Sequence, residues 1–319
     1  MNQNNTKIAV IMPVYNAEKF LSSALESLLN QSFQDIKIIC VDDASPDNCA
    51  QILKEFASKD KRIVSLKHNA NQGSSAARNT GLDYVFNYLP DVEYIALMDA
   101  DDRIEPNAYE RAYNEAQKYD VDILNFNFLP STAWEYKTIP SGEPLNYENN
   151  CIEAIFEHAE FYTYIVCWSK LYKKNLLKNI RFSSFKFFED GSFAYKVLPR
   201  AKKMRVIPDV LYSYNIENPK SMCTKTSNTE RLNAIFKIIK ETCQDWRKLG
   251  IFEKYKYSYI THILTYASLV CPDVIQGDYT KELVESFELD VLNEELLSNI
   301  PEQAQKLIFK MTNQEKCHV

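Results

Sequence analysis

The sequence predicts an α/β protein with a mostly parallel central sheet, followed by a helical C-terminal region. Short, continuous apolar runs of strand type recur in the N-terminal half, and each is followed by apolar residues at helical spacing. Strands that alternate with helices in this way are typical of a parallel sheet covered by helices. From Thr229 onward the apolar spacing is helical, which predicts the C-terminal region.

Each predicted element has recognisable boundaries. Asn16 is a suitable N-cap for the helix after the first strand, and Ser45 with Pro46 suits the start of the helix after the second. The predicted strands are 7–14, 36–41, 63–66, a run ending at Met98, and 121–128, with two short extended segments at 206–208 and 211–215. The predicted helices follow Asn16, Ser45 and Gly73 and span 106–118, 232–239 and 255–269.

Composition excludes several functional classes. The chain has 319 residues, of which 45% are hydrophobic, enough for a sizeable core. A net charge of -6 argues against general nucleic-acid binding, which needs a basic surface. Eight cysteines without a CxxC pair and only four histidines fit reduced thiols better than disulfides or a zinc site.

The chain shows no sign of a leader or a membrane span. Its N-terminus is polar, and the apolar stretch 259–271 is too short to cross a bilayer. None of the six glycines forms a GxGxxG or P-loop pattern, which weakens dinucleotide-binding and P-loop interpretations. We therefore expect a cytoplasmic protein.

Polar and acidic residues follow the predicted strands. Tyr15 follows the first strand, Asp42 and Asp43 the second, and the cluster Asp99-Ala100-Asp101-Asp102 a later one. The carboxyl ends of parallel strands meet at one edge of the sheet, which is where ligands bind in such folds. The cluster alone would also fit a solvated turn, but convergence of several such ends favours a site. An Asp-x-Asp pair there suits a hard cation shared with nucleotide phosphates.

Several motifs occur in register. They are Pro13-Val14-Tyr15-Asn16, Gln31-Ser32-Phe33, Val41 to Asp47, Asn71-Gln72-Gly73 with Ala77-Arg78-Asn79, and Asp99 to Asp102. In order and spacing this set resembles the family-2 glycosyltransferases of the non-processive bacterial type. The resemblance implies the Rossmann-like GT-A fold of nucleotide-diphospho-sugar transferases, a divalent metal, Mn²⁺ or Mg²⁺, and inversion at the anomeric carbon.

The resemblance also assigns roles to single residues. Pro13 and Tyr15 would border the nucleobase, and Asp43 would accept its hydrogen bond, most readily from uracil. Arg78 would lie near the nucleotide, and the Asp99-x-Asp101 pair would address ribose and metal, with Asp101 the main metal ligand. Tyr15 as a packing residue, Asp42 as structural and Asp47 as a first-turn residue of the next helix are the plainer alternatives.

A second part of the resemblance lies at Phe188-Glu189-Asp190-Gly191, in which the acidic pair supplies the catalytic base. Phenylalanines at 187, 188 and 193 surround the pair, and an apolar setting raises a carboxylate's affinity for a proton. We expect Asp190 to be the base of a single displacement and Glu189 to hold a partner in place. A capping pair at a helix start is the alternative.

The domain boundaries follow from these patterns. Residues 1–224 are predicted to form the transferase domain, with a nucleotide-sugar half at 1–128 and an acceptor half at 129–224, and residues 225–319 a helical region. Lys220 and Ser221 either close over the diphosphate or form a surface turn. Basic residues of the helical region form either a solvated face or a peripheral membrane contact, useful for a lipid-linked acceptor.

We therefore expect an inverting, metal-dependent glycosyltransferase that moves a sugar from a nucleotide-sugar, most readily UDP-linked, to a hydroxyl of a glycan or lipid-linked acceptor in surface polysaccharide synthesis. A sugar-1-phosphate nucleotidyltransferase is the alternative enzyme, disfavoured because no glycine-rich loop follows the first strand. A catalytically inactive sugar-binding module is the alternative of another class. The donor sugar, the acceptor and the oligomeric state do not follow from the sequence.

Overall fold

A computed structural model describes residues 6–130, 142–157, 164–185, 187–216, 227–270, 280–287, 298–299 and 301–312. The chain forms two compact units. The first comprises residues 1–184 and 189–219, and the second residues 185–188 and 220–319. The predicted catalytic, nucleotide-binding and metal-binding residues all belong to the first unit.

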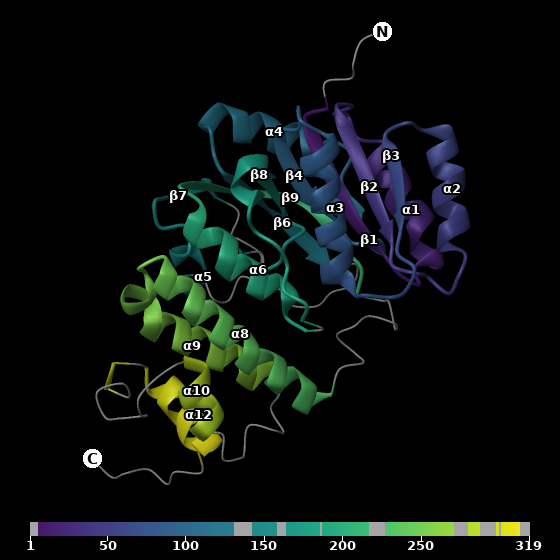
Figure 1. The fold of residues 1–319 in the computed structure, drawn as a ribbon. Coiled ribbons are helices and arrows are strands. Elements are labelled where there is room, and N and C mark those ends of the chain that lie inside the picture. The colour runs from purple at the N-terminus through teal and green to yellow at the C-terminus, as the bar shows by residue number, and fades with distance from the viewer. Residues whose placement is uncertain are drawn as a thin grey trace. The chain divides into compact units, whose positions relative to one another are not determined.

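A nine-stranded sheet with the order β3-β2-β1-β4-β8-β6-β9-β5, and β7 paired to β9, forms the centre of the first unit (Figure 1). Parallel pairing joins β3, β2, β1 and β4, whereas β8 is antiparallel to both β4 and β6. The strands are β1 (Ile8–Val14), β2 (Ile36–Asp42), β3 (Ile63–Lys67), β4 (Tyr94–Leu97), β5 (Arg103–Ile104), β6 (Ile123–Pro130), β7 (Leu145–Glu148), β8 (Lys170–Lys173) and β9 (Lys203–Tyr214).

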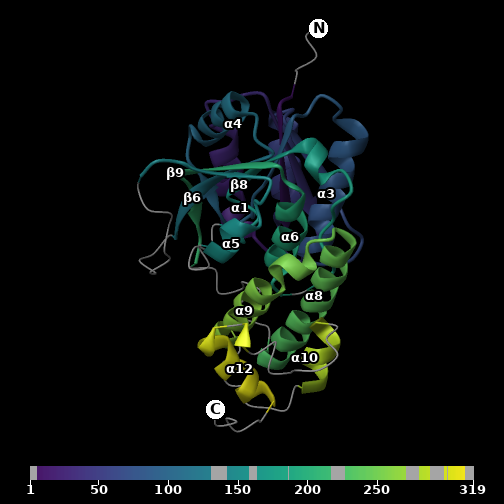
Figure 2. The same cartoon turned by 90° about the vertical axis from the view of Figure 1, so that its left-hand side faces the viewer.

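Helices flank this sheet, as Figures 1 and 2 show from two directions. They are α1 (Glu18–Leu29), α2 (Cys49–Lys59), α3 (Ser74–Tyr88), α4 (Ala108–Tyr119), α5 (Glu153–Glu157) and α6 (Glu189–Val197), with short 3-10 turns η2 (Lys174–Leu177) and η3 (Leu198–Arg200). The predicted α/β class is confirmed.

Two predicted helix caps are wrong. Asn16 and Ser45 precede helices that begin only at Glu18 and Cys49. Asn16 instead adopts a left-handed conformation with φ of 53°, and its backbone N–H donates to the Ser45 hydroxyl at 3.2 Å. The turns after β1 and β2 therefore bind each other before either helix starts.

The two extended segments predicted near Pro208 form one strand, β9. Its pairing with β6 shifts in register between Phe126 and Phe128, opposite the proline. Proline cannot donate to a ladder, so a local irregularity lets the strand continue past it.

Helix α3 packs unusually close to the centre of the sheet. A Cβ built on Gly81 would lie 2.3 Å from Cγ2 of Ile11, a core residue of β1 with no exposed surface. Only glycine therefore allows α3 to approach β1 at this distance. Arg78 lies one helical turn before this contact, so the close packing fixes where its side chain begins.

We predict that Gly81→Ala lowers the free energy of unfolding by about 1–3 kcal/mol, because the added methyl overpacks the core. Helix propensity alone would predict a gain of about 1 kcal/mol, so the sign of the change decides between the two effects. Chemical denaturation measures it, with the exposed α3 residue Asn87→Ala as control. A stabilised Gly81→Ala variant would contradict the packing argument.

The second unit contains α8 (Asn228–Lys248), α9 (Phe252–Val270), α10 (Thr280–Phe287) and α12 (Glu302–Thr312). A capping box starts α8, in which the Ser227 hydroxyl accepts from the Glu230 N–H and the Glu230 side chain accepts from the Ser227 N–H. The buried Trp246 ring lies 4.9 Å from that of Tyr259 on α9. Within the described residues, no helix has both the length and the apolarity needed to cross a bilayer.

Candidate active site

The buried guanidinium of Arg78 is the centre of the candidate site. Its Nη2 donates to Oδ1 of Asp99 at 2.8 Å, and its Nη1 lies 3.2 Å from both Oε1 of Glu189 and Oδ1 of Asp190. Arg78 is only 3% exposed. The predicted donor-side and acceptor-side carboxylates, far apart in sequence, therefore meet at one side chain from α3.

Asp190 lies in the first turn of α6 and is bound on both oxygens. Its Oδ2 accepts the Cys167 backbone N–H at 3.3 Å, and its Oδ1 faces Arg78. Burial raises the pKa of Asp190 to about 6; Arg78 opposes this rise, and the charges of Glu189 and Asp99 add to it. Its side chain keeps 20% exposure, so a substrate hydroxyl can reach a carboxylate suited to taking a proton near neutral pH.

Glu189 connects two helix starts. Its Oε1 accepts the Ser74 hydroxyl at 3.0 Å, from the first residue of α3, and also faces Arg78. Because both acidic residues stand in the first turn of α6, the capping alternative describes their position correctly. Their contacts with Arg78 also make both carboxylates partners of the buried guanidinium.

The acidic turn after β4 divides into two kinds of carboxylate. Asp99 and Asp101 are partly exposed, and Asp99 faces Arg78. Asp102 is buried, and it accepts the Tyr212 hydroxyl at 2.6 Å and the Asn215 N–H at 2.8 Å. Burial, with the charges of Asp101 and Asp99, raises the pKa of Asp102 well above its usual range.

Asp43 holds the loop that leads into α3. Its carboxylate accepts the backbone N–H groups of Gln72, at 2.9 and 3.1 Å, and Gly73, at 2.7 Å. Nδ1 of the buried His68 lies 2.6 Å from Oδ1 of Asp43, and its Nε2 2.9 Å from the Thr80 hydroxyl. A nucleobase N–H would therefore bind a carboxylate that already accepts hydrogen bonds from the loop. Asp43 thus has a structural role in addition to its predicted role in base binding.

The remaining predicted base-binding residues lie at the same edge of the sheet. Pro13 is half-buried in β1, and Tyr15, just beyond that strand, is 49% exposed. A large aromatic ring exposed at this edge is available to a planar ligand. The predicted mobile pair Lys220 and Ser221 lies outside the described residues.

The residues could bind a divalent ion only if the substrate provided some of the metal ligands. No cluster of three or more His, Cys, Asp or Glu side chains able to hold a metal occurs in the part of the chain that the structure describes. Asp99 and Asp101 offer hard carboxylate oxygens. Mg²⁺ is commonly held by one or two carboxylates together with substrate phosphates, and this donor set suits that arrangement. Asp99 also faces Arg78, and Asp101 stays the predicted main ligand.

Sequence reasoning missed three buried polar residues near these groups. Lys170 in β8 donates from Nζ to the Val166 carbonyl at 2.5 Å, and burial lowers its pKa to about 7. His68 and Tyr212 bind the carboxylates of Asp43 and Asp102. A lysine inside an apolar strand pattern was a visible signal, whereas the other two had none.

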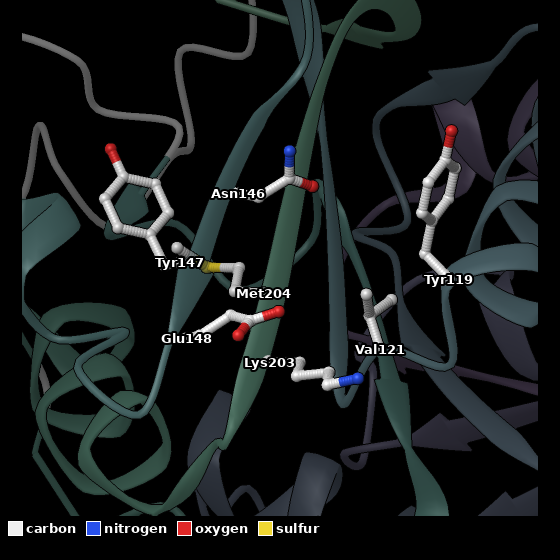
Figure 3. A pocket seen from close by; sticks show the side chains of 7 residues that line it. All are labelled: Tyr119, Val121, Asn146, Tyr147, Glu148, Lys203 and Met204. Carbon is white, nitrogen blue, oxygen red and sulfur yellow. The ribbon is translucent and has the colours of Figure 1, made fainter.

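A separate small pocket lies at the opposite edge of the sheet (Figure 3). Met204 pairs with Ile123 where β9 and β6 begin, away from the strand ends that carry the acidic residues. The pocket is lined by Tyr119, Val121, Asn146, Tyr147, Glu148, Lys203 and Met204. It contains none of the predicted site residues.

We predict that Arg78→Gln destabilises the fold by about 3–5 kcal/mol at pH 7, as expected when one partner of a buried ion pair is removed. Arg78 opposes the rise that burial causes in the pKa of Asp190, so without the cation this pKa rises further and the folded state binds more protons than the unfolded one. The loss in Tm should thus be larger at pH 8 than at pH 5. Arg181→Gln, which removes a half-exposed pair with Asp83, is the control. A loss independent of pH would contradict the charge argument.

Comparison with known proteins identifies the family of the chain. Residues 9–188 match the family model described as "Glycosyl transferase family 2". The glycosyltransferase GlyA of Streptococcus pneumoniae is 35% identical over 218 residues, 66% of this chain and 30% of that protein. The minor teichoic acid biosynthesis protein GgaB of Bacillus subtilis is 30% identical over 232 residues, 71% of this chain and 25% of that protein. The chain thus spans less than a third of either relative.

A solved structure shares the fold. The crystal structure of S. aureus TarS 1-349 in complex with UDP-GlcNAc superimposes with a TM-score of 0.69 at 19% identity, covering 94% of this chain and 83% of that one. The match over residues 9–188, together with the sheet order and the shared fold, shows that the chain belongs to glycosyl transferase family 2 and has the GT-A fold.

Proposed function

We propose that this glycosyltransferase moves a sugar from a UDP-sugar to a hydroxyl of a surface glycan, in one displacement that inverts the anomeric carbon. The observation that carries the proposal is the Arg78 guanidinium, which holds Asp99 and Asp190 at a single point. Donor binding and proton removal both need carboxylates, and only their proximity allows one reaction to use both.

The donor half uses the edge where β1, β2 and β4 end. Tyr15 offers its exposed ring to the base beside Pro13, and Asp43 shapes the adjoining loop as well as facing the base. Asp101, with Asp99, would hold Mn²⁺ or Mg²⁺, an ion that supplies positive charge to the departing diphosphate. The hydrogen bond from Arg78 fixes the Asp99 carboxylate.

The acceptor half depends on Asp190. The acceptor hydroxyl gives its proton to the Asp190 carboxylate as its oxygen bonds to the anomeric carbon, and the bond from that carbon to the diphosphate breaks. The Cys167 N–H and Arg78 fix the carboxylate in place. Its pKa of about 6 gives an ionised base at neutral pH that is more basic than an ordinary aspartate.

Two similarities support the donor and acceptor classes. TarS, which shares the fold, binds UDP-GlcNAc, and GgaB takes part in teichoic acid biosynthesis. We propose by analogy a UDP-linked donor and a hydroxyl-bearing glycan or lipid-linked cell-surface polymer as acceptor. Residues 225–319 would then serve as a separate helical region, and its contact with a membrane surface stays a prediction.

We predict Mn²⁺- or Mg²⁺-dependent hydrolysis or transfer with at least one member of a UDP-sugar panel, measured as UDP release. Asp101→Ala should lose this activity and require more metal for what remains, whereas the exposed Asp35→Asn should behave as wild type. If the wild type binds and cleaves no nucleotide-sugar, the proposed function fails.

We predict that Asp190→Asn lowers transfer to acceptor by about 10²–10⁴-fold, the usual contribution of a general base. UDP binding should be retained, because the base does not hold the nucleotide. For the wild type, the transfer rate should rise with pH through about 6 and then level off.

The same variant should not lose stability. The pKa of Asp190 is higher in the folded state than in the unfolded state. Protonated Asp190 therefore stabilises the fold at pH values below its unfolded-state pKa, and this contribution is lost as the pH rises through about 6. The Tm of Asp190→Asn at pH 8 should therefore equal or exceed that of wild type, with a smaller difference at pH 5.

Full transfer activity in the Asp190→Asn variant would disprove the base assignment.

A further inference from the structure

The turn from Asp99 to Asp102 is anchored to a strand that contributes no acidic residue to the site. The Tyr212 hydroxyl, on β9, donates to Oδ2 of Asp102 at 2.6 Å and accepts the backbone N–H of Asp99 at 3.2 Å. One side chain thus binds both ends of the turn that contains Asp101. The hydroxyl is buried, so water does not compete for these bonds.

The backbone on either side of the turn is also fixed. Met98 N–H donates to the Ile11 carbonyl at 3.1 Å, which extends the pairing of β4 with β1. After the turn, Ile104 pairs with Tyr212 itself in the antiparallel β5–β9 ladder. The tyrosine therefore stands where the chain leaves the turn, and its hydroxyl reaches back to where the chain enters it.

The Tyr212 ring is held independently of its hydroxyl. It stacks on the buried Trp168 ring at 4.5 Å and 17°, and Trp168 also stacks on Tyr214 at 5.2 Å and 12°. Trp168 directly follows Cys167, whose N–H binds Asp190 at 3.3 Å. The aromatic stack consequently connects the donor-side turn with the segment that positions the base.

We infer that Tyr212 is a positioning residue for donor binding, whose hydroxyl holds Asp99 and Asp101 in the orientation that the nucleotide and its metal require. This inference rests on the proposed function. Removing the hydroxyl leaves an unpaired Asp99 N–H and an under-bonded Asp102 carboxylate, and the turn relaxes. Residues that orient metal ligands typically change affinity by about 10–100-fold when they are lost.

The test is calorimetric titration of UDP in the presence of Mn²⁺ into wild type, Tyr212→Phe and Tyr94→Phe. The phenylalanine at 212 keeps the stack on Trp168. Tyr94 is the matched control, because it is equally buried, lies on β4 at the far end from the turn, and donates its hydroxyl to the Val121 carbonyl at 3.2 Å. Thermal unfolding of each variant measures the structural cost alone.

We expect the Kd for UDP to rise about tenfold in Tyr212→Phe and to be unchanged in Tyr94→Phe, although both variants lose some Tm. The acid limb of the pH–rate profile should stay near that of wild type in both variants, because Asp190 keeps its partners. Wild-type UDP affinity in Tyr212→Phe would overturn the inference while leaving the proposed function intact. Absence of UDP binding by the wild type would overturn both.

Asp102→Asn provides a second route if Tyr212→Phe does not fold. The amide keeps the volume of the carboxylate and an oxygen for the Asn215 N–H, but its NH₂ group cannot accept the tyrosine hydroxyl. The same increase in Kd should follow in this variant. An unchanged Kd would overturn the inference by this route as well.

Discussion

A nearly fully buried arginine is the constraint on which the site depends. A guanidinium stays charged at any physiological pH, and a buried charge is tolerated only when it is paired and hydrogen-bonded. Arg78 meets this requirement with Asp99, Glu189 and Asp190, which come from the end of β4 and the start of α6. Folding cannot satisfy the arginine without also assembling the two acidic motifs. The close contact of Gly81 with Ile11 fixes the helix that carries it.

A different set of contacts fixes the turns after β1 and β2. Helices α1 and α2 cap each other: the Glu18 N–H donates to Oδ2 of Asp47 at 3.0 Å, and the Asn48 N–H donates to the Glu18 carboxylate at 3.1 Å. Asn16 and Ala44 have positive φ values of 53° and 57°. A left-handed alanine is strained and persists only where its surroundings over-determine it. The two left-handed residues directly follow Tyr15 and Asp43, the residues proposed to meet the nucleobase.

Periodicity and strand-end chemistry predicted the fold class and the positions of β1 to β4 along the chain, because parallel strands leave a simple apolar pattern. The helix starts predicted from Asn16 and Ser45 are wrong, because these residues join the two turns to each other: the Asn16 N–H donates to the Ser45 hydroxyl. No local pattern marks such contacts between loops. Arg78 was predicted only through resemblance, and its position as the partner of three carboxylates depends on tertiary packing. Tyr212 lies 110 residues from Asp102, so its hydrogen bond could not be read from local sequence.

The charge of the site explains why it would need more than its own arginine to bind a nucleotide-sugar. One guanidinium faces three acidic side chains, and Asp101 belongs to the same turn as Asp99, so acidic groups outnumber the one cation. A diphosphate is also anionic and would be repelled. Lys170 adds little positive charge, because burial lowers its pKa to about 7 and its Nζ is bound to a backbone carbonyl. A divalent ion between Asp101 and the diphosphate would reverse this repulsion. Burial raises the pKa of Asp190, Arg78 opposes this rise, and the charges of Glu189 and Asp99 add to it. The acidic neighbours that would call for a cation at the proposed donor end therefore also favour proton uptake by the proposed base.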